Sequence, residues 1–324
     1  MTQSCPQVIV TRRLPAAVEA RMEALFDVRL NRDDEAFDRE ALLQAVGACD
    51  VLVPTLTDRI DAALTEAAGD RLKLIASFGA GTDHIDLAAA KARGIAVTNT
   101  PGALTEDTAD LIMALILGVP RGFGEGERIL RAGKWTGWAP TNLLGRSLGG
   151  KALAIVGMGR IGKAVARRAR ACGMEIHYHN RSPVPEAEEQ TLGARYWSDL
   201  DAMLAQADIV SLCCPYTPET HHLIDRRRFA LLKRQAVLIN AARAGVVEQE
   251  AMIEALETGR LAGVGLDVYP DEPEVDPRLV ALPNAMLLPH LGSASIETRT
   301  AMGERIVANI LAWQAGEELP DRVV

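Results

Sequence analysis

ALAIVGMGRIG, at residues 152–162 of the 324-residue chain, joins an apolar run to three regularly spaced glycines. The run predicts a buried strand, and the glycines follow it in the spacing GxGxxG at the start of an expected helix. The first glycine permits a tight turn, the second lets the backbone approach a pyrophosphate, and the third allows close packing of helix on strand. Unpaired N–H groups at the helix start can then bind the anion. We therefore predict a dinucleotide-binding loop formed by Gly157, Met158, Gly159, Arg160, Ile161 and Gly162.

Short apolar runs on both sides of this loop alternate with amphipathic segments. This alternation predicts βαβ units and parallel sheets, and hence an α/β protein. The expected strands, besides 152–156, are 8–10, 51–53, 72–77, 95–98, 174–179, 208–213, 236–241, 263–268 and 285–289. The expected helices include 60–68, 84–92, 160–172 and 295–315, the last with Ser293 or Ser295 as its N-cap and Gly316 at its end.

The pattern changes between residues 102 and 150, where we place a domain boundary. A helix that begins at Glu106 runs into Pro120 and several glycines, and WTGWAPTNLLGRSLGG follows at 135–150. A proline inside a helix should kink it. A length of 324 residues predicts two domains at about 150 residues each.

The composition excludes several classes of protein. With 48% hydrophobic and 24% charged residues the chain is globular, and a formal net charge of −8 lacks the basic excess of a nucleic-acid-binding protein. The apolar run 111–119 is too short to span a membrane, and the N-terminus lacks a signal-peptide pattern, so we expect a cytoplasmic protein without membrane contact. The five cysteines show no CxxC spacing and the six histidines no HExxH, so we expect no metal centre.

The residues after the strand at 174–179 bear on the choice of cofactor. A loop selective for NAD carries Asp or Glu about 20 residues after the glycine motif, where it accepts from the ribose 2′-hydroxyl. Here the chain has Asn180, Arg181 and Ser182 instead. Arg181 can neutralise a 2′-phosphate, and its neighbours can donate hydrogen bonds to it. We therefore predict NADPH as the preferred cofactor, with NADH possible.

Ionisable residues follow three of the later strands. Arg243 follows the strand at 236–241, Asp267 and Glu272 follow GVGL, and His290 follows AMLLP. Each alone is more often a solvated or structural residue, but the carboxyl ends of parallel strands gather at one edge of a sheet, where ligands bind. Together they indicate a site.

These motifs resemble the D-isomer-specific 2-hydroxyacid dehydrogenase family, and within it the glyoxylate and hydroxypyruvate reductases. The similarity covers nearly the whole chain. The matching segments are ASFGAGTDHID at 76–86, VTNTPGALTEDTADL at 97–111, WTGWAPTNLLGRSLGGK at 135–151, GMGRIG at 157–162, DIVSLCCPYTPETHHLI at 208–224, LINAARAGVV at 238–247, GLDVYPDEP at 265–273 and PHLGSAS at 289–295.

The resemblance implies a role for each matching residue. Arg243 corresponds to the substrate-binding arginine, Glu272 to its acidic partner, and His290 to the acid/base. Asp267 corresponds to a carboxylate that contacts the nicotinamide carboxamide. Further cofactor contacts are expected from Thr108, Cys214, Pro215, Thr220 and Ala241.

The chemistry of a 2-oxo acid reduction suits these side chains. Hydride transfer to the carbonyl carbon leaves an alkoxide, which an imidazolium such as His290 can protonate near neutral pH. A neighbouring carboxylate, Glu272, favours the charged imidazolium and fixes its orientation. The planar fork of Arg243 can hold the substrate carboxylate at two points.

The first domain should supply the rest of the substrate site. Phe78, Gly79, Ala80 and Gly81 leave a strand with small side chains, so their N–H groups can form a nest for an anion. The resemblance places Trp135 and Trp138 in a segment of a homodimer contact, with Trp138 in the substrate pocket. Cys213 stands where many relatives have His, which alters a contact on the adenosine side.

The resemblance implies two Rossmann-like domains with parallel sheets. The dinucleotide-binding domain, 102–290, is inserted in a flavodoxin-like substrate domain formed by 1–101 and 291–324. We expect a reductase of glyoxylate and hydroxypyruvate. The alternatives are another D-2-hydroxyacid dehydrogenase acting on 2-ketogluconate, phenylpyruvate or 3-phosphoglycerate, and a dinucleotide-sensing binding protein, since one fold serves many functions.

Overall fold

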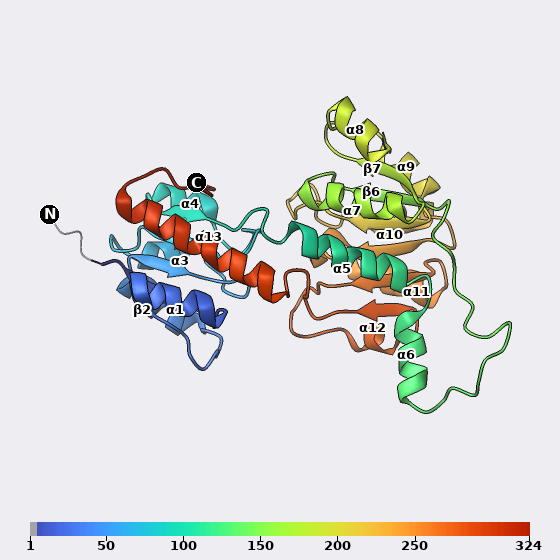
Figure 1. Cartoon of the computed structure of the whole chain (residues 1–324), viewed down its shortest axis with the longest axis horizontal. Helices are drawn as coiled ribbons and strands as arrows, with labels where there is room; N and C mark the ends of the chain where they lie inside the picture. Colours follow the sequence, from blue (N-terminus) through green and yellow to red (C-terminus); the bar gives the residue numbers. More distant parts are fainter. Residues whose placement is uncertain (1–4) are drawn as a thin grey trace. The chain divides into compact units, whose positions relative to one another are not determined.

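The computed structural model describes residues 5–324 and divides into two compact units. Unit 1 comprises the residues up to Leu104 together with Ala294–Val324, and unit 2 comprises Thr105–Ser293. Figure 1 shows how this division follows the sequence: the red C-terminal helix α13 (Ile296–Ala315) lies with the blue and cyan N-terminal elements in unit 1.

Unit 1 is a five-stranded parallel sheet in the order β2-β1-β3-β4-β5, the flavodoxin-like order. Alternate residues of β1 serve the two faces: Val8 and Val10 pack with α13 and α1, and Ile9 packs with α2 to α4. The strands are β1 Gln7–Val10, β2 Asp27–Arg29, β3 Val51–Val53, β4 Leu74–Ala76 and β5 Ala96–Thr98. The other helices are α1 Ala16–Leu25, α2 Arg39–Ala48, α3 Ala62–Ala67 and α4 Leu87–Ala92.

Unit 2 is a seven-stranded parallel sheet in the order β12-β11-β10-β9-β6-β7-β8. Counted from β6 as the first strand, the order is 3-2-1-4-5-6-7, a Rossmann sheet extended by one strand. The strands are β6 Ala152–Val156, β7 Glu175–His179, β8 Ala194–Tyr196, β9 Ile209–Leu212, β10 Val237–Asn240, β11 Gly263–Leu266 and β12 Ala285–Leu287.

Helices cover both faces of the unit 2 sheet. One face packs on α5 and α7, and the other packs on α9, α10 and α11. The helices are α5 Thr105–Gly118, α6 Phe123–Arg131, α7 Arg160–Ala171, α8 Glu186–Leu192, α9 Leu200–Gln206, α10 Arg226–Leu231, η1 Ala244–Val246, α11 Gln249–Glu257 and α12 Pro277–Ala281. The predicted α/β class with two parallel sheets is confirmed.

The segment around Pro120 differs from its prediction. Instead of one kinked helix, α5 ends at Gly118 and a separate helix, α6, begins at Phe123. Proline cannot donate a main-chain hydrogen bond, and Gly122 adopts a left-handed φ of 64°, so the helical hydrogen-bond pattern stops rather than bends. The helix prediction at 295–315 is confirmed: Ser295 accepts a hydrogen bond from Thr298 N–H, and Gly316 ends the helix with φ 71°.

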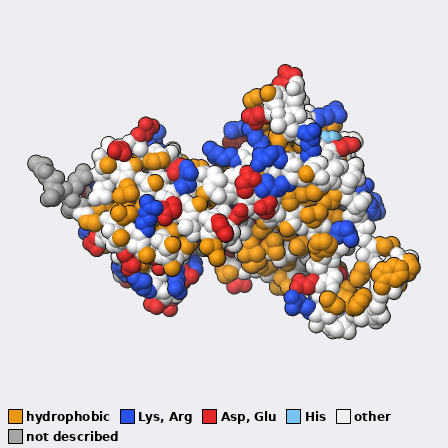
Figure 2. All heavy atoms as spheres, in the orientation of Figure 1, with side chains coloured by type: hydrophobic (Ala, Val, Ile, Leu, Met, Phe, Trp, Pro, Cys, Tyr) orange, Lys and Arg blue, Asp and Glu red, His pale blue; other side chains and the backbone are white. Residues whose placement is uncertain are grey.

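Unit 2 exposes apolar side chains on α6 and on the segment 132–147 that follows it. Trp138 is 84% exposed and Leu144 is 74% exposed, and Leu130 and Trp135 are also exposed. In Figure 2 orange side chains gather on this part of unit 2, at the lower right. Within residues 5–324, no helix is both long and apolar enough to cross a bilayer, and no three His, Cys, Asp or Glu side chains are grouped so that they could hold a metal ion.

Candidate active site

The glycine loop between β6 and α7 contains two packed glycines and one open glycine. A Cβ on Gly157 would lie 2.7 Å from main-chain atoms of Cys213 and Cys214, and Gly157 has φ 101°. A Cβ on Gly162 would lie 2.2 Å from the carbonyl oxygen of Gly157. A Cβ on Gly159 would meet nothing within 4 Å. The loop is therefore compact at Gly157 and Gly162, and it leaves an open space at Gly159, where the first turn of α7 begins. We call this space the cradle.

Asn180 fixes the glycine loop from the end of β7. Its side-chain Oδ1 accepts a hydrogen bond from Met158 N–H at 2.8 Å, and the Met158 side chain is buried. The Met158 N–H is thus occupied within the protein, and the N–H groups of Arg160, Ile161 and Gly162 in the first turn of α7 are those without intrahelical acceptors. This use of Asn180 had no signal in the sequence.

Arg181 and Ser182 lie on the exposed loop that follows β7. Glu219 lies within electrostatic reach of Arg181: its pKa is lowered, chiefly by a hydrogen bond from Thr217 and to a smaller degree by the Arg181 charge. Thr220 Oγ1 in the same segment donates to the Pro215 carbonyl and accepts from Thr217 N–H, both at 2.8 Å. Cys214 begins this segment just after β9, next to Gly157.

Arg243 stands in a turn directly after β10. The backbone of Arg243 is extended, with φ −145° and ψ 142°, and η1 follows it. Its Nη1 donates to the Ala242 carbonyl at 2.8 Å, and the residue is half-buried, as is Ala241. The guanidinium is therefore folded over its own turn at the carboxyl edge of the sheet.

His290 and Glu272 form a pair at the same edge. The Nδ1 atom of His290 lies 2.8 Å from Oε2 of Glu272, whose Oε1 accepts from Tyr269 N–H at 2.9 Å. Burial raises the pKa of Glu272, but the hydrogen bonds from His290 and Tyr269 and the charges of His290 and Arg243 outweigh it, so this pKa lies below its ordinary value. An ionised carboxylate only accepts, so we assign the proton to Nδ1. About a third of each side chain is exposed, 32% for His290 and 34% for Glu272, which leaves the ring accessible to a small ligand.

Asp267 holds the segment that carries His290. Its two carboxylate oxygens accept from Leu291 N–H at 2.6 Å and from Gly292 N–H at 2.8 Å, and the side chain is buried. Thr108 Oγ1 donates to the Gly292 carbonyl at 2.9 Å. His290 itself has φ 54°, a left-handed conformation that costs a residue with a Cβ about 1–2 kcal/mol. Asp267 and Thr108 thus stabilise a strained turn, while burial raises the pKa of Asp267.

The segment 78–81 of unit 1 follows β4. Phe78 N–H donates to the Pro54 carbonyl and Gly79 N–H to the Ser77 carbonyl, so two of its four N–H groups are used internally. The remaining donors are those of Ala80 and Gly81. The carbonyl of Ala80 accepts from the Asn99 side chain at 2.6 Å, which fixes the segment.

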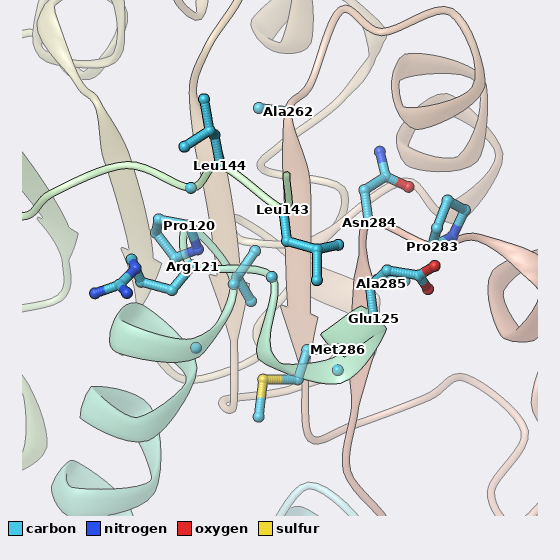
Figure 3. Close-up of a pocket in the computed structure, with 15 residues that line it drawn as sticks. Pro120, Arg121, Glu125, Leu143, Leu144, Ala262, Pro283, Asn284, Ala285 and Met286 are labelled. Carbon is cyan, nitrogen blue, oxygen red and sulfur yellow. The ribbon is translucent and has the colours of Figure 1, made fainter. Parts of the chain in front are cut away.

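An apolar cavity of about 300 Å³ lies in unit 2, away from these residues. Figure 3 shows Leu143, Leu144 and Met286 around it, between the α5–α6 break and the residues that begin β12. Ala262 and Asn284 line it just before β11 and β12 start, at the amino ends of strands whose carboxyl ends carry Asp267 and His290. None of the predicted site residues lines this cavity.

Comparison with known proteins identifies the family. A family model described as "D-isomer specific 2-hydroxyacid dehydrogenase, NAD binding domain" matches residues 113–292. The chain is 44% identical over 322 residues to a glyoxylate reductase of Thermococcus litoralis, covering 98% of this chain and 96% of that protein. It belongs to the D-isomer-specific 2-hydroxyacid dehydrogenases. This dehydrogenase is therefore an NAD(P)-dependent oxidoreductase.

Solved structures resemble this dehydrogenase along its whole length. A putative D-isomer specific 2-hydroxyacid dehydrogenase from a Polaromonas species matches with a TM-score of 0.92 and 39% identity, covering 99% of this chain and 100% of that chain. An NADPH-dependent glyoxylate/hydroxypyruvate reductase from Sinorhizobium meliloti, in complex with NADP and malonate, matches with a TM-score of 0.86 and 33% identity, covering 99% and 97%.

Proposed function

We propose that this dehydrogenase is an NADPH-preferring reductase of small 2-oxo acids, which converts glyoxylate to glycolate and hydroxypyruvate to D-glycerate. The observation that carries the proposal is the His290–Glu272 pair, 2.8 Å apart and accessible, at the carboxyl edge of a sheet in this family. The relatives support the choice of substrates: one is a glyoxylate reductase, another a glyoxylate/hydroxypyruvate reductase.

The chain's own residues supply the acid and the substrate clamp. A bound nicotinamide dinucleotide supplies the hydride. His290, oriented by Glu272 through Nδ1, donates the proton on its other ring nitrogen to the carbonyl oxygen, so that hydride and proton together give the hydroxyl group. Arg243 holds the substrate carboxylate and polarises the adjacent carbonyl. We also assign substrate contacts to the 78–81 segment, through the N–H groups of Ala80 and Gly81.

The cofactor assignment rests on the glycine loop. The open cradle at Gly159 and the first turn of α7 fit a pyrophosphate, because no side chain fills the space and N–H groups lie at its edge. We assign the 2′-phosphate of NADPH to Arg181 with Ser182, since both are exposed and no carboxylate stands in the Asn180–Ser182 segment. The remaining proposed cofactor contacts are Thr108, Cys214, Pro215, Thr220, Ala241 and Asp267.

We propose a homodimer that forms through α6 and the segment 132–147. The exposed Leu130, Trp135, Trp138 and Leu144 support it, because large exposed apolar side chains that cluster on one segment mark an interaction surface. Trp138 would then serve the substrate pocket. Sedimentation of the wild-type chain and of Trp138→Ala tests the dimer. A cytoplasmic location completes the proposal and agrees with five free thiols.

Initial rates of NADPH and NADH oxidation test the function directly. We expect fast NADPH oxidation with glyoxylate and hydroxypyruvate and slower oxidation with phenylpyruvate, 2-ketogluconate and phosphohydroxypyruvate. Activity confined to a bulky or phosphorylated acid would show that the substrate assignment is wrong and would leave the proposed mechanism unchanged. Tight NADPH binding without oxidation by any of these acids would contradict a reductase and favour a dinucleotide sensor.

A further inference from the structure

Asn240, the last residue of β10, makes hydrogen bonds to the turn that carries Arg243. Its side chain is 1% exposed. Its Nδ2 donates to the carbonyl oxygen of Arg243 at 2.9 Å, and its Oδ1 accepts from Ala242 N–H at 3.1 Å. Its main-chain carbonyl accepts from Asp267 N–H at 3.0 Å. One buried residue therefore binds both the Arg243 turn and the start of the loop after β11.

The two hydrogen bonds of this amide fix the main chain of the turn that carries Arg243. Strand pairing of β10 with β9 and β11 ends at Asn240, so the next residues lose their sheet partners. The Asn240 amide replaces those partners for Ala242 N–H and Arg243 C=O. Since Arg243 Nη1 in turn donates to the Ala242 carbonyl, the position of the guanidinium depends on the shape of this turn.

We propose that Asn240 is a positioning residue for the 2-oxo acid: it holds the Arg243 turn so that the guanidinium can bind the substrate carboxylate. This inference rests on the proposed function of Arg243. If the buried amide only stabilised the fold, its removal would lower the melting temperature and weaken the binding of glyoxylate and of NADPH alike. Asn240 should instead act on the Michaelis constant of the acid.

Asn309 provides a matched control in unit 1. It is a buried asparagine on α13, at 0% exposure, and its Nδ2 donates to the Arg305 carbonyl at 2.8 Å and to Asp321 Oδ2 at 2.9 Å. Its Oδ1 accepts from Asp321 N–H at 3.1 Å. Asn309→Ala therefore removes an equally buried amide that also holds main-chain groups, with one further bond to a carboxylate and no hydrogen bond to the Arg243 turn.

The experiment compares Asn240→Ala, Asn240→Asp, Arg243→Lys, the double variant Asn240→Ala/Arg243→Lys and Asn309→Ala. For each, kcat and KM for glyoxylate, the Kd for NADPH and the melting temperature are measured. We expect Asn240→Ala to raise KM for glyoxylate about tenfold, as loss of buried hydrogen bonds does, with the Kd for NADPH changed less than about twofold. Asn240→Asp keeps the acceptor for Ala242 N–H, loses the donor to Arg243, and should raise KM as well.

The double variant tests whether Asn240 acts through Arg243. We expect it to be no more than about twofold worse than Arg243→Lys alone, since residues that act as one unit are not additive. Asn309→Ala should lower the melting temperature and leave KM unchanged.

Each contrary result has a separate meaning. A raised KM in Arg243→Lys with an unchanged KM in both Asn240 variants overturns the positioning role alone. An unchanged KM in Arg243→Lys overturns the assignment of Arg243, and the role of Asn240 with it. If both Asn240 variants unfold while Asn309→Ala stays folded, Asn240 is a folding residue and the inference is wrong.

Discussion

The two units carry similar parallel sheets but present different chemistry at the strand ends. In unit 1 the segment 78–81 has small residues and offers main-chain N–H groups from Ala80 and Gly81. In unit 2 the turns after β10, β11 and β12 present the ionisable side chains of Arg243, Glu272 and His290. The same kind of sheet thus carries main-chain donors at its strand ends in one unit and ionisable side chains in the other.

The two units also differ in the side chains that hold these loops in place. A main-chain nest needs only small residues and an anchored backbone, as Asn99 gives to Ala80. A side chain that binds a ligand must also be oriented, and in unit 2 the buried Asn240 and Asp267 form hydrogen bonds with the turns that carry Arg243 and His290. In the proposed site of unit 2, the turns that carry Arg243 and His290 are thus held by buried polar side chains.

Replacing the acid of unit 2 should have the largest effect. We expect His290→Asn to lower kcat for glyoxylate at least about a hundredfold while the Kd for NADPH stays within about twofold, because general acid catalysis is lost and cofactor binding is not. Stopped-flow turnover and NADPH fluorescence titration measure the two quantities. His177→Asn is the control, since His177 lines a cavity near the strand starts of the same sheet. Equal kcat in His290→Asn and wild type would contradict the role of His290 as the proton donor.

The glycine loop offers a matched pair of variants. In Gly162→Ala the new Cβ would meet the Gly157 carbonyl at 2.2 Å, so we expect a loss of about 1–3 kcal/mol in the free energy of unfolding. In Gly159→Ala it would meet no protein atom within 4 Å, so the melting temperature should hold while the Kd for NADPH rises about tenfold. Wild-type NADPH affinity in Gly159→Ala would show that the pyrophosphate binds elsewhere.

Arg181 tests whether unit 2 distinguishes the two dinucleotides. Arg181→Ala should raise KM for NADPH about tenfold and leave KM for NADH nearly unchanged, because only NADPH brings a 2′-phosphate. Steady-state kinetics with both cofactors at saturating glyoxylate give the ratio. Arg234→Ala, at an exposed position just before β10, serves as a comparison for a general loss of positive charge away from the glycine loop. Equal effects of Arg181→Ala on both cofactors would contradict the phosphate assignment.

Gly79 in unit 1 should tolerate replacement by alanine better than Gly162 does. A Cβ on Gly79 would lie 2.9 Å from Cδ2 of Leu56, the end of a flexible side chain that can move. We expect Gly79→Ala to raise KM for glyoxylate only a few-fold and to cost less stability than Gly162→Ala. Thermal unfolding and initial rates measure both. A larger loss of stability in Gly79→Ala would mean that the nest is as tightly packed as the glycine loop.

The smallest effect should come from the pH dependence of stability at Glu272. Its pKa is lowered in the folded protein, so its ionised form stabilises the fold. That contribution is present above the unfolded pKa of about 4.3 and is lost as the pH falls through the folded value. We expect the difference in melting temperature between wild type and Glu272→Gln to be larger at pH 7 than at about pH 3.5. A difference independent of pH would show that the carboxylate charge does not stabilise the fold.

Sequence patterns predicted the α/β class and most strands because their signals are local. The runs at 51–53 and 152–156 coincide with β3 and β6, since buried strands need continuous apolar residues. The edge strands β2 and β8 were missed because they are half-exposed and read DVR and ARY, which lack such a run. The prediction of a kink after α5 was wrong, because a proline with neighbouring glycines marks an interruption of a helix without distinguishing a kink from an end.

The sequence by itself determined the strand–glycine–helix unit and the residue types of the site, because glycine spacing and strand periodicity act over a few neighbouring residues. Only the tertiary structure decided which groups meet. His290 and Glu272 are 18 positions apart and pair through the strand register of β11 and β12. The bonds from Asn240 to the Arg243 turn and from Asp267 to the turn after His290 likewise depend on where parallel strands end, which only a folded sheet fixes.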